Sequence, residues 1–145
     1  MNNDSELSRI VRGFFEEAIN GHDLQALDTY CSPDYRWNGS DHSADALSDL
    51  HGLAAFKRLV GEFFVAFPDF HTDILDEIVG KDRVVVRYEE GGTHASDFLG
   101  VPASGKKVIW PGIGIYRIEN GLIAEEWFQS ALIERMRAAA GIPGA

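Results

Sequence analysis

The sequence predicts a single α+β domain, in which an antiparallel sheet carries helices packed on one face. Helical periodicity dominates the first half of the chain, and strand patterns follow one another in the second half. Parallel strands would require helical connections between them, and the later strands of this sequence have none. A length of 145 residues fits one domain that spans the whole chain, 1–145.

Three helices are expected before the sheet. The first runs from Asp4 or Ser5 to about Asn20, because its apolar residues recur every three or four positions. Asp23 would cap a second, short helix over 24–31. The segment 32–34 is predicted as a turn, 35–37 as a short strand and 38–50 as a polar loop with a turn of helix. A third helix covers 53–67 and stops before Pro68.

The strands are expected from residue 70 onward. Segments 70–79 and 83–89 are predicted as strands around a turn at 80–82, the second because it is rich in β-branched residues, and Gly91-Gly92 would loosen that second strand. After a connection over 95–105, two further strands meet at Glu119-Asn120-Gly121. Asn-Gly is a strong hairpin signal because both residues tolerate positive φ. Residues 130–140 form a short helix or a tail.

Both faces of this hairpin carry large apolar side chains. In its first arm, one face holds Trp110, Gly112, Gly114, Tyr116 and Ile118, and the other holds Ile109, Ile113, Ile115 and Arg117. In its second arm, the alternating sets are Ala124, Glu126, Phe128 and Ser130 against Ile123, Glu125, Trp127 and Gln129. One face must meet the helices. The other is covered either by a second copy of the chain or by the chain's own termini.

The composition excludes several classes of function. The net charge is −10, from 23 acidic and 13 basic residues, which disfavours nucleic acid and anionic membranes as partners. Cys31 is the only cysteine, so an internal disulfide is impossible. No apolar run is long enough to span a membrane and no signal peptide is evident, so we expect a cytoplasmic protein. The five histidines lack metal-ligand spacing, and no cofactor motif occurs, so we expect neither metal nor cofactor.

A stretch of the second half resembles a known family. The residues GGTHASDFLGVPASGKKVIWPGIGIYRIENGLIAEEW at 91–127 are similar to the signature of SnoaL-like proteins, the polyketide-cyclase or ester-cyclase branch of the NTF2-like superfamily. The first helix and the segments SPDY and FPDF also fit. The resemblance implies a cone, with a curved antiparallel sheet wrapped around N-terminal helices and an apolar cavity. Relatives include aldol-type cyclases, isomerases, dehydratases and proteins implicated in hydroxylation, and many are dimers.

The chain departs from the family at two positions. The resemblance implies a catalytic His and Asp on the two arms of the hairpin, and these positions fall on Gly114 and Phe128 here. Neither residue can transfer a proton, so the resemblance implies that this chain does not perform the same aldol cyclisation with the same residues. The alignment also implies that the face with Gly112, Gly114, Tyr116, Glu126 and Phe128 lines the cavity.

Glu126 is the main acid/base candidate, because an apolar pocket should raise the pKa of a carboxyl group. The alternative is that the strand turns it toward solvent or an arginine. Tyr116 could donate to a developing oxyanion. His94 matches the family turn and is either structural or catalytic. The expected substrate contacts, each of which has ordinary packing as its alternative, are Trp37, Asn38, Trp110, Gly112, Gly114, Phe128 and Ser130. The facing of Arg87 and Glu89 stays open.

The sequence therefore predicts a cofactor-independent enzyme that cyclises, isomerises or hydrates a polyketide-like or other carbonyl-rich apolar molecule. Two alternatives remain. One is a small-molecule-binding protein without catalysis, favoured by the absence of the family's His/Asp pair. The other is an accessory role in hydroxylation. A homodimer formed through the outer sheet face is expected in each case.

Overall fold

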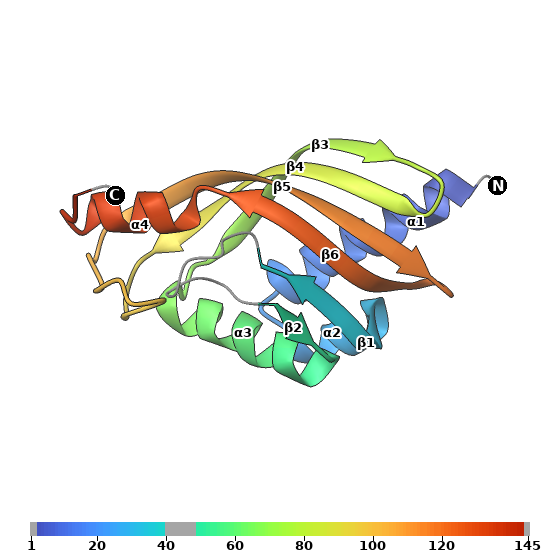
Figure 1. The fold of residues 1–145 in the computed structure, drawn as a ribbon, viewed down its shortest axis with the longest axis horizontal. Coiled ribbons are helices and arrows are strands. Elements are labelled where there is room, and N and C mark those ends of the chain that lie inside the picture. The colour runs from blue at the N-terminus through green and yellow to red at the C-terminus, as the bar shows by residue number, and fades with distance from the viewer. Residues whose placement is uncertain (1–2, 40–48, 144–145) are drawn as a thin grey trace.

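The computed structural model describes residues 3–39 and 49–143, which form one curved sheet with helices beneath it (Figure 1). The helices are α1 (Asn3–Gly13), η1 (Phe14–Ile19), η2 (Leu24–Ala26), α2 (Leu27–Tyr30), α3 (Leu53–Ala66) and α4 (Leu132–Ala139). The strands are β1 (Cys31–Asn38), β2 (Leu50–His51), β3 (His71–Val79), β4 (Arg83–Thr93), β5 (Lys107–Glu119) and β6 (Leu122–Ser130). The predicted α+β class is confirmed. Residues 40–48, which include most of the predicted polar loop, lie outside the described residues.

The sheet is mixed, which corrects the prediction of a purely antiparallel one. The strand order is β2-β1-β6-β5-β4-β3, and every neighbouring pair is antiparallel except β1 and β6. The chain leaves β1, passes through α3 and builds the β3–β5 meander before it returns as β6. Because of this long excursion β6 can lie beside β1 in the same direction. Strand periodicity does not reveal such a pairing.

The first predicted helix is present, but it changes geometry halfway. Residues 3–13 are α-helical, whereas Phe14–Ile19 form a π-helix. The apolar residues of this segment are buried as the periodicity predicts, because the helix lies under the sheet.

The carboxylate of Asp23 accepts hydrogen bonds from the backbone N–H groups of Gln25 and Ala26, so the predicted cap is confirmed.

Two segments that were predicted to interrupt strands are parts of strands. The predicted turn at 32–34 lies within β1, at a register shift between Cys31 and Arg36. The predicted loosening at Gly91-Gly92 is absent, because both residues pair with β5. A Cβ atom at Gly91 would overlap the Val108 carbonyl oxygen, and one at Gly92 would lie 2.7 Å from Asp69 Oδ1. These glycines allow close approach of backbone and do not end the strand.

The β5–β6 hairpin forms around the predicted turn. Asn120 and Gly121 have φ values of 53° and 78°, the left-handed conformation that a tight hairpin turn requires. A register shift between Arg117 and Ile118 places Ile118 opposite Ile123. Ile123 is consequently fully buried, which corrects its predicted position on the outer face.

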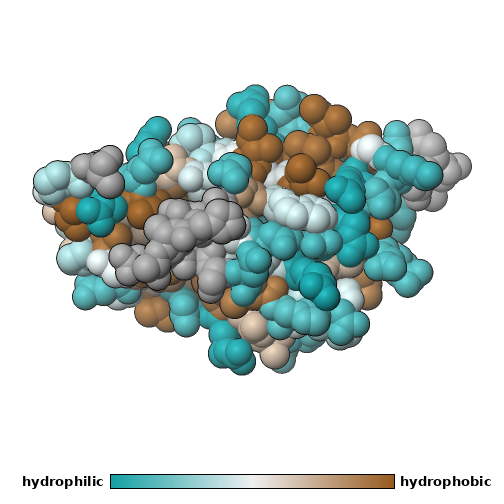
Figure 2. Space-filling view, in the orientation of Figure 1, coloured by the Kyte–Doolittle hydropathy of each residue, from teal (hydrophilic) through white to brown (hydrophobic). Residues whose placement is uncertain are grey.

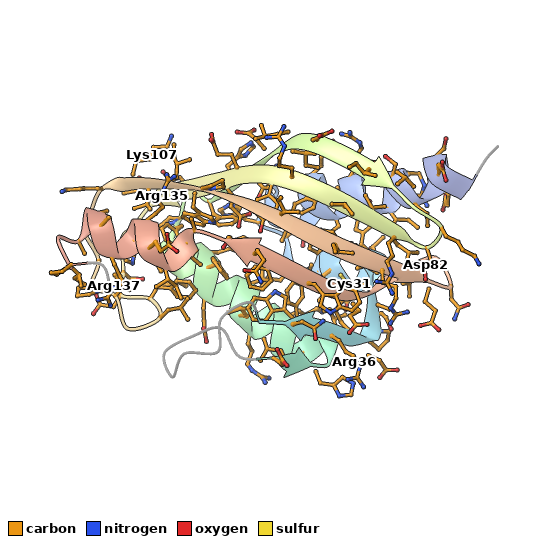
Figure 3. All side chains as sticks on the ribbon, turned by 45° about the horizontal axis from the view of Figure 1, so that its top comes forward. Cys31, Arg36, Asp82, Lys107, Arg135 and Arg137 are labelled. Atoms are coloured by element: carbon orange, nitrogen blue, oxygen red, sulfur yellow. The ribbon has the colours of Figure 1, made fainter. Side chains whose placement is uncertain are left out.

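The helices cover the inner face, which holds Trp110, Tyr116 and Phe128, and leave an apolar outer face accessible (Figure 1). The outer face has Ile78, Ile109 and Ile113 with exposed fractions of 63, 41 and 48%. Figure 2 shows hydrophobic side chains gathered over β3, β4 and β5 at the top of the molecule. Arg135 of α4 donates to the Ile109 carbonyl oxygen at 3.0 Å and ties α4 to β5 (Figure 3), yet Ile109 stays exposed.

No helix within 3–39 or 49–143 combines the length and the apolar character needed to cross a membrane.

Candidate functional site

A cavity lies between the inner face of the sheet and the helices η1 and α3. Its lining is mainly aromatic, with Phe14, Phe15, Trp37, Phe56, Phe63, Phe64, Phe70, Tyr88, Tyr116 and Phe128, complemented by Ile19, Leu59, Val60 and Leu132 and by the polar Glu90, Glu126 and Ser130. The cavity leaves about 80 Å³ of room for the centres of water molecules. This room suits a small ligand, and a large one would require aromatic side chains to move.

The π-helix contributes one wall. It supplies Phe14, Phe15 and Ile19 to the lining. The rings of Phe14 and Phe15 lie 5.9 and 5.5 Å from the Tyr116 ring, centroid to centroid. A π-helix is wider than an α-helix and occurs frequently at functional sites. Here it allows two consecutive phenylalanines to face the same tyrosine.

Glu126 on β6 is one of the residues that line the cavity. Its side chain is buried, and Tyr35 donates a hydrogen bond to its Oε1 atom. The Tyr116 hydroxyl hydrogen-bonds the same carboxyl group. Burial raises the pKa of Glu126 to about 8, and the negative charge of Glu90 adds to this, while the two tyrosine hydrogen bonds only partly offset it. Near neutral pH the carboxyl group is therefore mostly protonated.

Glu90 on β4 is a second carboxyl group in this cavity, and it is not among the residues predicted from the sequence. Thr72 Oγ1 donates to Glu90 Oε2 at 2.8 Å, and Trp110 Nε1 donates to Oε1 at 3.1 Å. Burial of the carboxyl group raises the pKa of Glu90 to about 7, against the effect of these two hydrogen bonds, although the residue as a whole keeps some accessible surface. Strand alternation could have found Glu90, because it lies two positions after Tyr88 and therefore on the same face of β4. That prediction requires knowing that Tyr88 points into the cavity.

The open question about Arg87 and Glu89 is settled by the same alternation. Both are exposed, whereas the intervening Tyr88 is buried and lines the cavity. Arg87 and Glu89 therefore face outward, opposite to Glu90.

Asn20 supports the Glu90 site from the end of η1. Its side-chain amide donates to the Thr72 carbonyl oxygen at 2.9 Å, and its Oδ1 atom accepts from the Thr72 N–H at 2.8 Å. This reciprocal pair attaches the helix to the edge strand β3. It fixes the residue whose hydroxyl holds Glu90.

The inner-face glycines accommodate tyrosine rings. A Cβ atom on Gly112 would lie 2.5 Å from Tyr88 Cζ, and one on Gly114 would lie 2.8 Å from the Tyr116 hydroxyl oxygen. Neither glycine is among the lining residues, so the room predicted above them is filled by the protein itself. Their influence on a ligand is through the placement of Tyr88 and Tyr116.

We expect Gly112→Ala to destabilise the protein by about 1–3 kcal/mol, because the Tyr88 ring would have to leave its place against β5. Gly61→Ala on α3 is the matched control, since its new Cβ would lie 3.6 Å from Leu24 Cδ1, an ordinary contact. In a helix that change should be neutral or stabilising. Urea denaturation of both variants measures the difference, and equal stabilities would contradict the role given to Gly112.

The other predicted site residues divide into two groups. Trp37, Phe128 and Ser130 line the cavity, and the rings of Trp37 and Phe128 lie 4.8 Å apart. Trp110 and Asn38 are not among the lining residues that the structure describes. Trp110 packs on Phe67 and Phe70 and acts on the cavity through Glu90, and Asn38 donates to the Glu126 carbonyl oxygen at 2.8 Å.

His94 lies outside the lining as well. It is fully buried and stacks on Phe67 with the ring centroids 5.1 Å apart. Burial lowers its pKa, so the imidazole is neutral near pH 7. Its backbone pairs with Gly105 and Lys106, which closes the connection between β4 and β5. In this placement the His94 ring packs within the core and does not border the cavity.

The comparisons with known proteins agree with this fold. The family model for SnoaL-like polyketide cyclases matches residues 9–139. The chain is similar to the structure of a protein from Jannaschia sp. CCS1 assigned as a SnoaL-like polyketide cyclase, with 22% identity, coverage of 99% of this chain and 97% of that chain, and a TM-score of 0.85. No curated protein matches the sequence.

Two further structures come from Streptomyces. AclR of S. galilaeus, named as a hydroxylase candidate, shows 23% identity over 97% of this chain and 100% of its own, with a TM-score of 0.80. IdmH of S. antibioticus, named as a polyketide cyclase candidate, shows 25% identity over 93% and 98%, with a TM-score of 0.75. The family model covers most of the sequence, and the chain belongs to the SnoaL-like polyketide cyclase family.

Proposed function

We propose that the protein is a cofactor-independent enzyme that cyclises, isomerises or hydrates a small carbonyl-rich molecule by proton transfer. The observation that carries this proposal is Glu126, a buried carboxyl group with a pKa of about 8 inside a largely aromatic cavity. A general acid is most effective when its pKa lies near the working pH. Glu126 meets this condition and would donate a proton to a ligand's oxygen.

The lining restricts the charge of the ligand. None of its described residues is a lysine, arginine or histidine, so an anionic ligand would find no countercharge. The aromatic walls favour a flat, apolar molecule. Tyr116 lies beside Glu126 with burial raising its pKa, so its neutral phenol is a second donor for an oxyanion.

A second candidate function is ligand binding without catalysis. Gly114 and Phe128, which occupy the positions implied for the family's His and Asp, are direct partners across the β5–β6 hairpin. Phe128 lines the cavity and offers only apolar surface there. The resemblance to AclR leaves an accessory role in hydroxylation as a third candidate.

Isomerisation of cyclohex-3-enone to its conjugated isomer distinguishes these functions. We expect the protein to accelerate this reaction, followed by the rise in ultraviolet absorbance. The buffer-catalysed rate is the control. Saturable binding of the ketone without acceleration would support the binding protein and contradict the enzyme.

We also propose a homodimer that buries the apolar outer face. The exposed Ile109 and Ile113 support it, because the described part of the chain leaves both uncovered. Light scattering should give about twice the chain mass of 16.0 kDa. Ile113→Asp should yield monomers, whereas Val65→Asp, at a 68% exposed position on α3, should leave the dimer intact. A wild-type mass near that of one chain would refute the dimer.

A further inference from the structure

Glu90 and Glu126 face one cavity, and this suggests a shared task. We propose that they act on one ligand as base and acid, an inference that rests on the proposed function. The Glu90 carboxylate removes a proton from the carbon beside a carbonyl group, and the Glu126 carboxyl group donates its proton to the carbonyl oxygen. The C–H electron pair becomes the new C=C bond, and the product of the step is a neutral enol.

The return step restores both residues. The enol O–H proton goes back to the Glu126 carboxylate, and the protonated Glu90 delivers its proton to a carbon of the enol π system. If that carbon differs from the first one, the result is an isomer with a shifted double bond. The complete cycle has no net gain or loss of protons, and while the enol is bound the proton on the partly accessible Glu90 exchanges with solvent. No oxidant, reductant or metal takes part in this sequence.

The register of the sheet places the two carboxyl groups apart. Glu90 pairs with Trp110 and Glu126 pairs with Tyr116, six positions further along β5. Six residues of a flat strand span about 20 Å. Both residues nevertheless line the same cavity, and the negative charge of Glu90 adds to the raised pKa of Glu126. A ligand in this cavity lies against both residues.

The partners of each carboxyl group decide its role. Trp110 Nε1 can only donate, and together with Thr72 it supplies one donor to each oxygen of Glu90. Two donors on two oxygens stabilise a carboxylate, the form that a base needs. Glu126 instead has tyrosine hydroxyls, which either donate or accept, so its protonated form keeps its hydrogen bonds. Glu90 is accordingly the base and Glu126 the acid.

The space between them selects the ligand class. Two rows separate the two carboxyl groups on the inner face. Tyr88 lies in one of them beside Gly112, and the Tyr116 ring lies against Gly114 of the other, so the ligand must fit against aromatic rings. Cationic side chains such as Arg36, Lys107, Arg135 and Arg137 lie at the periphery of the molecule (Figure 3). A small, neutral, conjugated ketone with an acidic C–H group fits these conditions.

Other titratable groups around the pair stay neutral between pH 6 and 9. Burial raises the pKa values of Tyr35, Tyr88, Tyr116 and Cys31 well above their usual values. The pH dependence of the rate therefore belongs to the carboxyl pair. It should be bell-shaped, with the acidic limb set by Glu90 and the basic limb by Glu126.

The test follows deuterium incorporation from D₂O into the C–H positions beside the carbonyl of 2-tetralone, measured by proton NMR. We expect the wild type to catalyse the exchange and Glu90→Gln to lower the rate about 100-fold or more. Glu89→Gln, which changes the exposed neighbour, should leave the rate unaltered. A wild type without exchange activity overturns the proposed function and this inference together. An active wild type whose rate survives Glu90→Gln but falls with Glu126→Gln overturns only the role of Glu90.

A second measurement is independent of any substrate. In ¹³C-glutamate-labelled protein, Glu90→Gln should lower the pKa of Glu126, because it removes a neighbouring negative charge; an unchanged titration would overturn the shared site. If Glu90→Gln does not fold, Trp110→Phe serves as the alternative test of the role of Glu90. It removes one donor from Glu90, so the acidic limb of the exchange rate should move to higher pH, and an unmoved limb would also overturn the inference.

Discussion

Raising the pH from about 5 to about 9 is expected to lower the free energy of unfolding by about 4 kcal/mol through Glu126 alone. The reference pKa of its carboxyl group is 4.5, and the pKa in the folded protein is about 8. A raised folded-state pKa means that the native protein binds this proton more tightly than the unfolded chain does. The stabilisation is complete below pH 4.5 and is lost as the pH rises toward 8, at about 1.36 kcal/mol per pH unit.

Glu90 adds to this loss of stability over a lower pH range. Its pKa is raised from 4.5 to about 7, so its contribution disappears between these values. The two effects are not independent, because the ionised Glu90 raises the pKa of Glu126. The combined loss should therefore begin above pH 5 and continue to about pH 8.

Urea denaturation at several pH values, followed by tryptophan fluorescence, measures this loss. Glu126→Gln cannot ionise, so its unfolding free energy should fall less steeply with pH than that of the wild type. Glu125→Gln changes the next residue, whose carboxylate pairs with Arg117 at 3.2 Å on the outer face, and should retain the steep dependence. Parallel curves for the wild type and Glu126→Gln would contradict the burial of this carboxyl group.

The second large effect concerns catalysis. Glu126→Gln should reduce the rate of cyclohex-3-enone isomerisation by about 10²–10⁴-fold, because the amide keeps the shape of the side chain but cannot exchange a proton with the ligand. The KM should change little, since the cavity walls remain. Steady-state kinetics separate kcat from KM in this comparison.

Glu125→Gln is again the control. It removes the carboxyl group of the neighbouring residue, whose side chain faces the opposite side of β6 from Glu126 and pairs with Arg117. Its kcat should equal that of the wild type. If Glu126→Gln retains full activity while the wild type is active, the general acid is another group. Tyr35→Phe is an independent test of Glu126 as the acid, since it removes a hydrogen-bond donor from the Glu126 carboxylate and should shift the basic limb of the pH profile upward.

Some features were accessible from the sequence because they depend on local order. The helix over 53–67, the capping role of Asp23 and the Asn120-Gly121 turn follow from periodicity, side-chain acceptors and permitted φ values within a few residues. The inward position of Glu126 with Phe128 followed from alternation together with the family resemblance. These relations do not require knowledge of distant contacts.

The features that the sequence missed depend on pairings between distant segments. The parallel neighbour of β1 is β6, about ninety residues later, and no local pattern records that choice. The inward position of Ile123 depends on a register shift against β5. Glu90 was overlooked because its partners Thr72 and Trp110 lie on two other strands, 18 and 20 residues away.

The sequence by itself determined an α+β domain of this family, a hairpin at its centre and one candidate acid within that hairpin. Only the tertiary structure decided that the cavity holds a second carboxyl group, and that the room above Gly112 and Gly114 belongs to Tyr88 and Tyr116. The physical reason is that burial and hydrogen bonding are properties of neighbours in space. A glutamate acquires a pKa near 7 or 8 only when the folded chain buries its carboxyl group, and for Glu126 the charge of a second carboxyl group adds to the effect of burial.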